Sequence, residues 1–171
     1  CIRDSGGAVM TNYKKYSNEA KLTINVSKEK KKGIIYHNKL GFNYKMPGLN
    51  ASLGIAQFKK INSFLKNKRK LANKYFKIFE DLSELKFFQE RKNTISNYWI
   101  VAACLSKKID KERLIKQAKK KNIALQSIWV PLHKLKYFKD YQRTSMRNTN
   151  NIFDSLICFP SSPYLICLLY T

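Results

Sequence analysis

The chain has 171 residues, of which 44% are hydrophobic and 13% aromatic. It can therefore bury one modest core with room for a second partial one, and it is not a disordered chain. Lys and Arg number 34 against 11 Asp and Glu, which gives a formal net charge of +23 and a pI of about 10.0. Its apolar runs are all shorter than the ~20 residues that a membrane-spanning helix needs.

The positive charge has two competing explanations. Nucleic-acid binding would use lysines to displace counterions from phosphates, and a clustered basic stripe typically marks it. An AT-rich genome would instead favour lysine codons and spread the charge over solvated faces. The lysines are distributed evenly from Lys14 to Lys139, with short runs only at 30–32 and 119–121. This distribution favours the second explanation.

The four cysteines point to free thiols in a reducing cytoplasm. They show no CxxC spacing, so the pattern indicates neither a zinc site nor a redox pair. They are Cys1, Cys104, Cys158 and Cys167.

The chain begins with GGAVMT at 6–11, which predicts a short buried strand, and the Lys-rich segment 12–32 predicts a loop with a helical piece. The segment 36–57, YHNKLGFNYKMPGLNASLGIAQ, gathers His, Asn, Tyr and Lys on a loop broken by Gly and Pro that leads into a helix. Polar side chains held in this way can converge on a phosphate group. The alternative is an ordinary solvated loop.

A long amphipathic helix is expected from Asn50, which follows the Pro47-Gly48 breaker and is a good capping residue. Lysines are expected on the opposite, solvated face. The apolar positions with helical spacing are Leu53, Phe58, Ile61, Leu65, Ala72, Tyr75, Phe79 and Leu82.

Alternating strands and helices follow this helix. The apolar run 98–105 predicts a central strand, with Tyr98 and Trp99 as core residues. Asp110 is expected to cap a helix, 123–128 to form a short strand, and 145–155 another helix, before the strand LICFP ends at Pro160. One sheet covered by helices, an α+β sandwich, accounts for this order.

Three segments closely resemble one enzyme family. They are GFNYKMPGLNASLGIAQFKKINSFLKNKRKLANKYF from Gly41, SNYWI at 96–100 and SIWVPLHKLKYFKDYQ at 127–142. Over about residues 6–162 the chain is similar to sugar aminotransferases of the DegT/DnrJ/EryC1/StrS family, which depend on pyridoxal phosphate. The subgroup that it resembles makes 4-amino sugars for legionaminic acid and related surface glycans.

The resemblance implies an α+β fold, the carboxy-terminal part of a fold type I aminotransferase. The expected domains are a remnant of the large domain at 1–48, a long connecting helix at 49–85, a small α/β sandwich domain at 86–162 and an atypical apolar tail at 163–171. Family members are about twice as long, so we expect a fragment that is inactive alone. The Schiff-base lysine of the family would lie upstream of Cys1, and no lysine of this chain matches it.

The implied reaction transfers an amino group, usually from glutamate, to a keto carbon of a nucleotide-linked deoxysugar. Pyridoxal phosphate in the full-length parent accepts the electrons released at the amino-bearing carbon. The implied assembly is a cytoplasmic homodimer without a membrane partner. Part of the positive charge would attract the anionic nucleotide sugar.

The resemblance also assigns roles to residues of the loop. Asn43 matches the asparagine that reaches across a dimer interface to the coenzyme phosphate of the other subunit. Lys45 stands where the family commonly has Arg, so a point charge replaces a two-pronged donor. Tyr44 is expected to pack, and His37 to line the substrate site, although a lone His is more often structural.

Further positions match with weaker motifs. Trp129 and His133 would flank the nucleotide sugar, although Pro131 is equally compatible with an ordinary strand exit. Ser5, Gly6 and Gly7 match the end of the glycine-rich turn that follows the family's lysine.

Two other function classes remain open at this stage. A basic nucleic-acid-binding module is less favoured. A non-catalytic, dimerising remnant predicts an exposed apolar face on the segment 6–11 and on the long helix.

Overall fold

The structure is a computed structural model that describes residues 7–168, with side chains described through residue 166. The chain divides into two compact units, Cys1–Ile61 and Asn62–Thr171, and each is described here by itself. Cys1, Ser5 and Gly6 lie outside the described residues, as does the side chain of Cys167.

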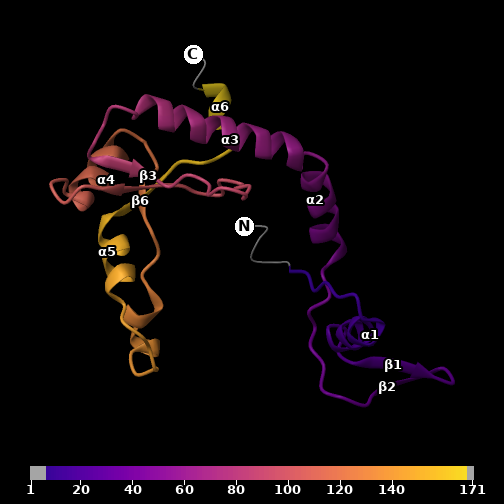
Figure 1. The fold of residues 1–171 in the computed structure, drawn as a ribbon. Coiled ribbons are helices and arrows are strands. Elements are labelled where there is room, and N and C mark those ends of the chain that lie inside the picture. Colours follow the sequence, from indigo (N-terminus) through magenta and orange to yellow (C-terminus); the bar gives the residue numbers. More distant parts are fainter. Residues whose placement is uncertain (1–6, 169–171) are drawn as a thin grey trace. The chain divides into compact units, whose positions relative to one another are not determined.

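The first unit contains two helices and a hairpin (Figure 1). Helix α1 (Lys14–Thr23) precedes strands β1 (Lys28–Lys31) and β2 (Ile34–His37), and helix α2 (Gly48–Phe58) follows. The strands pair antiparallel, with Lys28 opposite His37, and Gly33 turns the chain at a φ of 83°. The helical piece expected within 12–32 is therefore confirmed, whereas the hairpin was not predicted.

Three predictions for this unit are wrong. Residues 7–11 form no strand, because a strand needs a pairing partner and no described segment pairs with them. Val9 and Met10 are 78% and 93% exposed, so the segment is not buried either. Helix α2 begins at Gly48 with Pro47 at the N-cap, so Asn50 lies within the helix. The predicted single helix is two helices, because Lys59 and Lys60 form a turn between α2 and α3.

The second unit surrounds a four-stranded antiparallel sheet whose order is β3-β4-β6-β5. Its strands are β3 (Leu85–Phe87), β4 (Val101–Leu105), β5 (Gln126–Ser127) and β6 (Leu156–Phe159). Its helices are α3 (Ile61–Ile78), α4 (Lys111–Lys120), α5 (Arg147–Ser155) and α6 (Leu165–Leu168). Helix α3 starts at the last residue of the first unit. Two short 3-10 turns, η2 (Leu132–Lys134) and η3 (Lys136–Phe138), lie between α4 and α5.

One face of this sheet carries the core. Alternate residues of β4 are buried, and the register places Phe87 and Ile157 on either side of Ala103. Ala72 of α3 packs with Val101 near one end, together with Tyr98. Side chains of α4 pack near Leu105 and Ile157 at the other end. Two helices thus share a single sheet face, as the α+β prediction requires.

Local signals in the second unit predicted most of its elements. Asp110 caps α4, because its Oδ1 accepts a hydrogen bond from the Arg113 main-chain N–H at 3.0 Å. Strand β6 and helix α5 are also confirmed, whereas the strand predicted over 123–128 is only Gln126–Ser127. Within residues 7–168, no helix combines the length and apolar character that a membrane crossing requires.

Candidate functional site

The loop predicted to bind phosphate is fastened to the end of α1 by main-chain contacts. The carbonyls of Thr23 and Ile24 accept hydrogen bonds from the main-chain N–H groups of Phe42 and Tyr44, at 2.7 and 2.9 Å. Asn25 and Asn43 form an isolated antiparallel bridge between these bonds. The backbone at Asn43 is therefore held on both sides, as a residue that positions a ligand requires.

Gly41 permits this close approach. A β-carbon there would lie inside contact distance of the Ser27 main-chain nitrogen and the Val26 carbonyl carbon, and 2.6 Å from the Ser27 hydroxyl oxygen. Ser27 is itself 1% exposed and donates its hydroxyl hydrogen to the Leu40 carbonyl at 3.0 Å. Only a glycine fits beside a backbone at this distance. The sequence indicated a breaker at Gly41, but it gave no signal for Ser27.

The aromatic neighbours of Asn43 determine which side it occupies. The rings of Phe42 and Tyr44 stack with centroids 5.2 Å apart and planes 10° apart, so Tyr44 packs as expected. Side chains alternate along an extended, bridged backbone, which places Asn43 on the side opposite these rings. Asn43 and Lys45 are both exposed. The loop thus offers an amide N–H donor and, two residues on, an ammonium group, and both groups are suitable donors to a phosphate.

His37 lies at the end of β2 and contacts the same anchor segment. Its Nδ1 is 2.8 Å from the Val26 carbonyl oxygen, so Nδ1 must carry the hydrogen and donate it. Val26 in turn donates its main-chain N–H to the carbonyl of Phe42. The structure therefore brings His37 to the backbone that holds Asn43, and any substrate contact of His37 would use Nε2.

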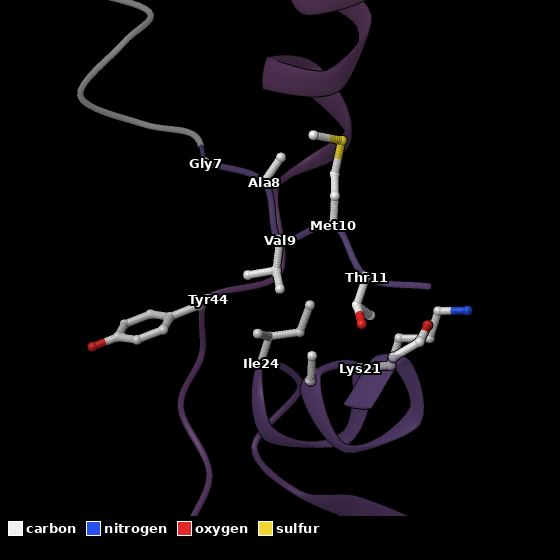
Figure 2. Close-up of a pocket in the computed structure, with 10 residues that line it drawn as sticks. Gly7, Ala8, Val9, Met10, Thr11, Lys21, Ile24 and Tyr44 are labelled. Carbon is white, nitrogen blue, oxygen red and sulfur yellow. The ribbon is translucent and has the colours of Figure 1, made fainter. Parts of the chain in front are cut away.

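A pocket of about 740 Å³ lies in the same unit, between the segment 7–11, α1 and the loop. Figure 2 shows Val9 facing Ile24 across it, with Thr11 and Lys21 toward one end and the ring of Tyr44 turned away. Gly7, the described residue of the predicted glycine-rich turn, lines this pocket.

In the second unit, Trp99 and Trp129 form an exposed aromatic pair. Their ring centroids are 5.7 Å apart with planes 28° apart, and 49% and 65% of their surfaces are exposed. Tyr98 is 7% exposed, so its prediction as a core residue is confirmed and that for Trp99 is wrong. The reason is that the strand predicted over 98–105 begins only at Val101, so Trp99 lies in a bend before it, next to the left-handed backbone of Tyr98 with a φ of 42°.

His133 is held against helix α5 rather than standing alone. Its Nε2 is 2.9 Å from the Asn150 Oδ1, which ties η2 to α5. Lys134 beside it lies 4.6 Å from the Phe153 ring centroid and 3.8 Å from the Asp154 carboxylate. A substrate contact of His133 would therefore use Nδ1.

Two cations of α3 fix the backbone that leads to Trp99, and no pattern in the sequence indicates either of them. The Lys68 ammonium donates to the carbonyls of Trp99 and Ser161, at 3.4 and 2.5 Å, and the Ser161 hydroxyl donates to the Trp99 carbonyl at 2.7 Å. Arg69 makes a two-pronged ion pair with Glu90. The position of a Lys or Arg along a helix does not reveal partners such as these, because they are distant in the sequence.

The described thiols and acidic groups suggest no metal centre. Across residues 7–168, no three His, Cys, Asp or Glu side chains group as they would around a metal ion. Cys104 and Cys158 are free thiols. Burial raises the pKa of Cys158, although the Lys111 charge partly opposes this shift.

Comparison with known proteins shows that the chain is similar to sugar aminotransferases. A model described as the DegT/DnrJ/EryC1/StrS aminotransferase family matches residues 4–166. The chain is 24% identical over 165 residues to the putative pyridoxal phosphate-dependent aminotransferase EpsN of Bacillus subtilis, covering 94% of this chain and 42% of EpsN. It is 28% identical over 109 residues to GDP-perosamine synthase of Escherichia coli O157:H7, covering 63% and 29%.

The solved structure of Helicobacter pylori PseC, an aminotransferase involved in the biosynthesis of pseudoaminic acid, superposes with a TM-score of 0.82. The two are 18% identical, and the match covers 91% of this chain and 43% of PseC. The α+β fold class predicted from the sequence is therefore confirmed as one shared with these enzymes. The chain spans less than half the length of the curated relatives that it matches.

Proposed function

Because the chain belongs to the DegT/DnrJ/EryC1/StrS aminotransferase family, we propose that it is part of a pyridoxal phosphate-dependent enzyme that aminates a keto nucleotide sugar. The amino donor is glutamate, and the product serves surface glycan biosynthesis in the cytoplasm. Two relatives named for GDP-perosamine and pseudoaminic acid support a sugar substrate. The legionaminic-type subgroup is the finer part of this proposal.

The single observation that carries the proposal is the anchored loop. Asn43 lies opposite the Phe42–Tyr44 stack on a backbone fixed by the bonds to Thr23 and Ile24, Lys45 follows it on the same loop, and both residues are exposed. An amide N–H and an ammonium group are suitable donors to a phosphate dianion. We assign these two residues to the coenzyme phosphate bound in the partner subunit of a homodimer. Pyridoxal phosphate, when bound, supplies the electron sink for moving a proton at the amino-bearing carbon.

The remaining site residues are assigned to the sugar nucleotide. The exposed Trp129 ring, stacked on Trp99, offers a flat apolar face. His133 is oriented by Asn150, and His37 by the Val26 carbonyl, so each presents its other ring nitrogen to a substrate.

The proposal concerns the whole protein in which these 171 residues occur, because the relatives are more than twice as long. By themselves, the residues are proposed to be inactive, since no lysine of the chain matches the family's Schiff-base lysine. The proposed domains are 1–48, 49–85, 86–162 and the tail 163–171, and the second of these contains α3 and all but the first residue of α2.

A borohydride experiment tests this function. The whole protein is purified, reduced with borohydride and mapped by peptide mass spectrometry, and its glutamate-dependent conversion of a keto nucleotide sugar is measured. We expect a phosphopyridoxyl group on one lysine, together with amino transfer. Substitution of Asn43→Ala should weaken coenzyme retention, whereas Asn38→Ala on the same loop should not. Absence of both the modified lysine and the aminated product contradicts the proposal.

A dimerising, non-catalytic remnant is the second candidate, and helix α2 favours it. No residue of α2 is buried, and Leu49 and Phe58 are 81% and 76% exposed. An apolar helix of this kind is normally covered by another protein surface. Light scattering of the 171-residue chain separates the cases. If the 171-residue chain is a dimer and borohydride traps no coenzyme in the whole protein, the remnant is supported. If the 171-residue chain is a monomer, the remnant is excluded.

A further inference from the structure

An apolar groove lies between α3 and α4, on the sheet face that both helices cover. Its volume is about 630 Å³, within the range of about 300–1,000 Å³ that is typical of small-molecule sites. Tyr75 of α3, Phe79 just after α3, Leu114 of α4 and Phe159 of β6 contribute apolar surface. All of these residues belong to the second unit, so the groove does not depend on the first.

Hydrogen bonds fix the walls of the groove. The Tyr75 hydroxyl donates to the Pro160 carbonyl at 3.0 Å on one side. On the other, the main-chain N–H of Ile123 donates to the Ala118 carbonyl at 2.9 Å, and Asn122 adopts a left-handed φ of 59°. These contacts close the carboxyl end of α4 in the manner of a helix C-cap. The groove is therefore a formed site with defined walls.

The charge of the lining selects among possible occupants. Lys121 is the single charged residue among the described lining residues, which include no carboxylate. Gln117 and Asn122 add side-chain amides beside it. A lining that is mostly apolar and carries one cation and two amides complements a molecule that has an apolar body and one anionic head group.

We propose that this groove binds a free amphipathic carboxylate, with its apolar chain against Phe79, Leu114 and Phe159 and its carboxylate at Lys121. The site is separate from the residues assigned to coenzyme and nucleotide sugar. The proposed carboxylate binding does not depend on the proposed aminotransferase activity.

Decanoate is the probe, and decanol is its uncharged counterpart with the same chain length. The ¹⁵N-labelled 171-residue chain is titrated with each, and amide shifts are followed by nuclear magnetic resonance. We expect saturable shifts at Gln117, Lys121 and Leu125 with decanoate, and weaker binding of decanol. The shifted amides must be assigned to residues, because exposed apolar residues of the first unit can also bind the alkyl chain of decanoate.

Matched variants separate the groove from general charge attraction. Lys121→Gln should weaken decanoate binding about threefold, the size expected for one exposed ion pair. Lys120→Gln removes a neighbouring charge outside the groove lining and should leave the affinity unchanged. Ala124→Phe, at an exposed lining position, should block binding by filling the groove while the unfolding midpoint of the chain is retained.

Three results overturn the proposal. They are decanoate shifts that do not saturate, saturable shifts located away from the groove, and equal effects of Lys121→Gln and Lys120→Gln. Decanoate shifts can be recorded for the unsubstituted chain, so the proposal is decided even if Ala124→Phe fails to fold.

Discussion

The Arg69 guanidinium and the Glu90 carboxylate form a two-pronged ion pair with nitrogen–oxygen distances of 2.6 and 2.9 Å. The same Glu90 accepts the main-chain N–H of Ser96 at 2.7 Å, and Arg69 donates to the Ser96 carbonyl. Arg69 also lies 5.7 Å from the Tyr98 ring centroid. The pair thus ties α3 to the segment that places Tyr98 in the core and Trp99 on the surface.

This ion pair predicts an acid-sensitive component of stability. Hydrogen bonds from Arg69 and then from the Ser96 N–H lower the pKa of Glu90 from 4.5 to about 2. The stabilisation is fully present above the ordinary pKa of 4.5 and is lost as pH falls toward about 2. The difference in unfolding free energy between the unsubstituted chain and the Glu90→Gln variant, measured by urea titration, should therefore shrink as pH falls from 4.5 toward about 2.

Glu80→Gln, at an exposed glutamate after α3, is the control and should show no such convergence. A difference for Glu90→Gln that stays constant across this pH interval would show that the ion pair does not stabilise the fold.

Gly41→Ala should disturb the loop that carries Asn43. The added β-carbon meets the backbone at Val26 and Ser27, which cannot move aside as a flexible side chain does. We expect a cost of about 1–3 kcal/mol, the usual range for overpacking. Hydrogen exchange at the Tyr44 amide, which is bonded to the Ile24 carbonyl, reports the loosening directly.

Gly54→Ala is the matched control, because a β-carbon at this position of α2 would meet no atom within 4 Å beyond the adjacent residues and the backbone of its own helix. It should be neutral or stabilising, since Ala has the higher helix propensity. Similar exchange rates in the two variants would mean that Gly41 is not required by the loop.

Asp110→Ala should destabilise α4 by about 1 kcal/mol, because the Arg113 N–H loses its capping acceptor. Urea unfolding measures the loss. Asp110→Asn keeps a capping oxygen and should recover most of the stability. Equal destabilisation by Ala and Asn would attribute the effect to charge rather than to the cap.

The Trp99–Trp129 stack should give a measurable coupling energy. A double-mutant cycle with Trp99→Leu and Trp129→Leu should yield about 0.5–1.5 kcal/mol. A parallel cycle of Trp99→Leu with Tyr137→Leu uses another exposed aromatic residue and should yield none. Equal coupling in the two cycles would indicate a general effect of removing surface aromatics.

Local chemistry predicted those parts of the fold that depend on near neighbours. The Asp110 cap needs only the helix that follows it, and β6 ends where Pro160 stops a compact apolar run. Apolar periodicity indicates a helical face but not continuity, so the turn at Lys59 and Lys60 was missed. The hairpin was missed because all four residues of β1 are charged.

The candidate site was predictable in its residue types and not in its contacts. The sequence motif around Asn43 indicated the loop, whereas the attachment of the loop to Thr23 and Ile24 is made by backbone atoms, which leave no sequence pattern. Trp99 was placed in the core because the continuous apolar run 98–105 predicted a buried central strand, whereas β4 begins only at Val101 and Tyr98 before it has a left-handed backbone. Such conformations at residues other than Gly and Asn depend on tertiary packing.

The most direct test of the aminotransferase account is the distance between the Asn43 side-chain nitrogen and the coenzyme phosphate in a crystal structure of the whole protein with pyridoxal phosphate. The account predicts a hydrogen bond, with a nitrogen–oxygen distance of about 3 Å, to the phosphate held by the partner subunit. A structure in which Asn43 contacts no coenzyme phosphate in either subunit would contradict it.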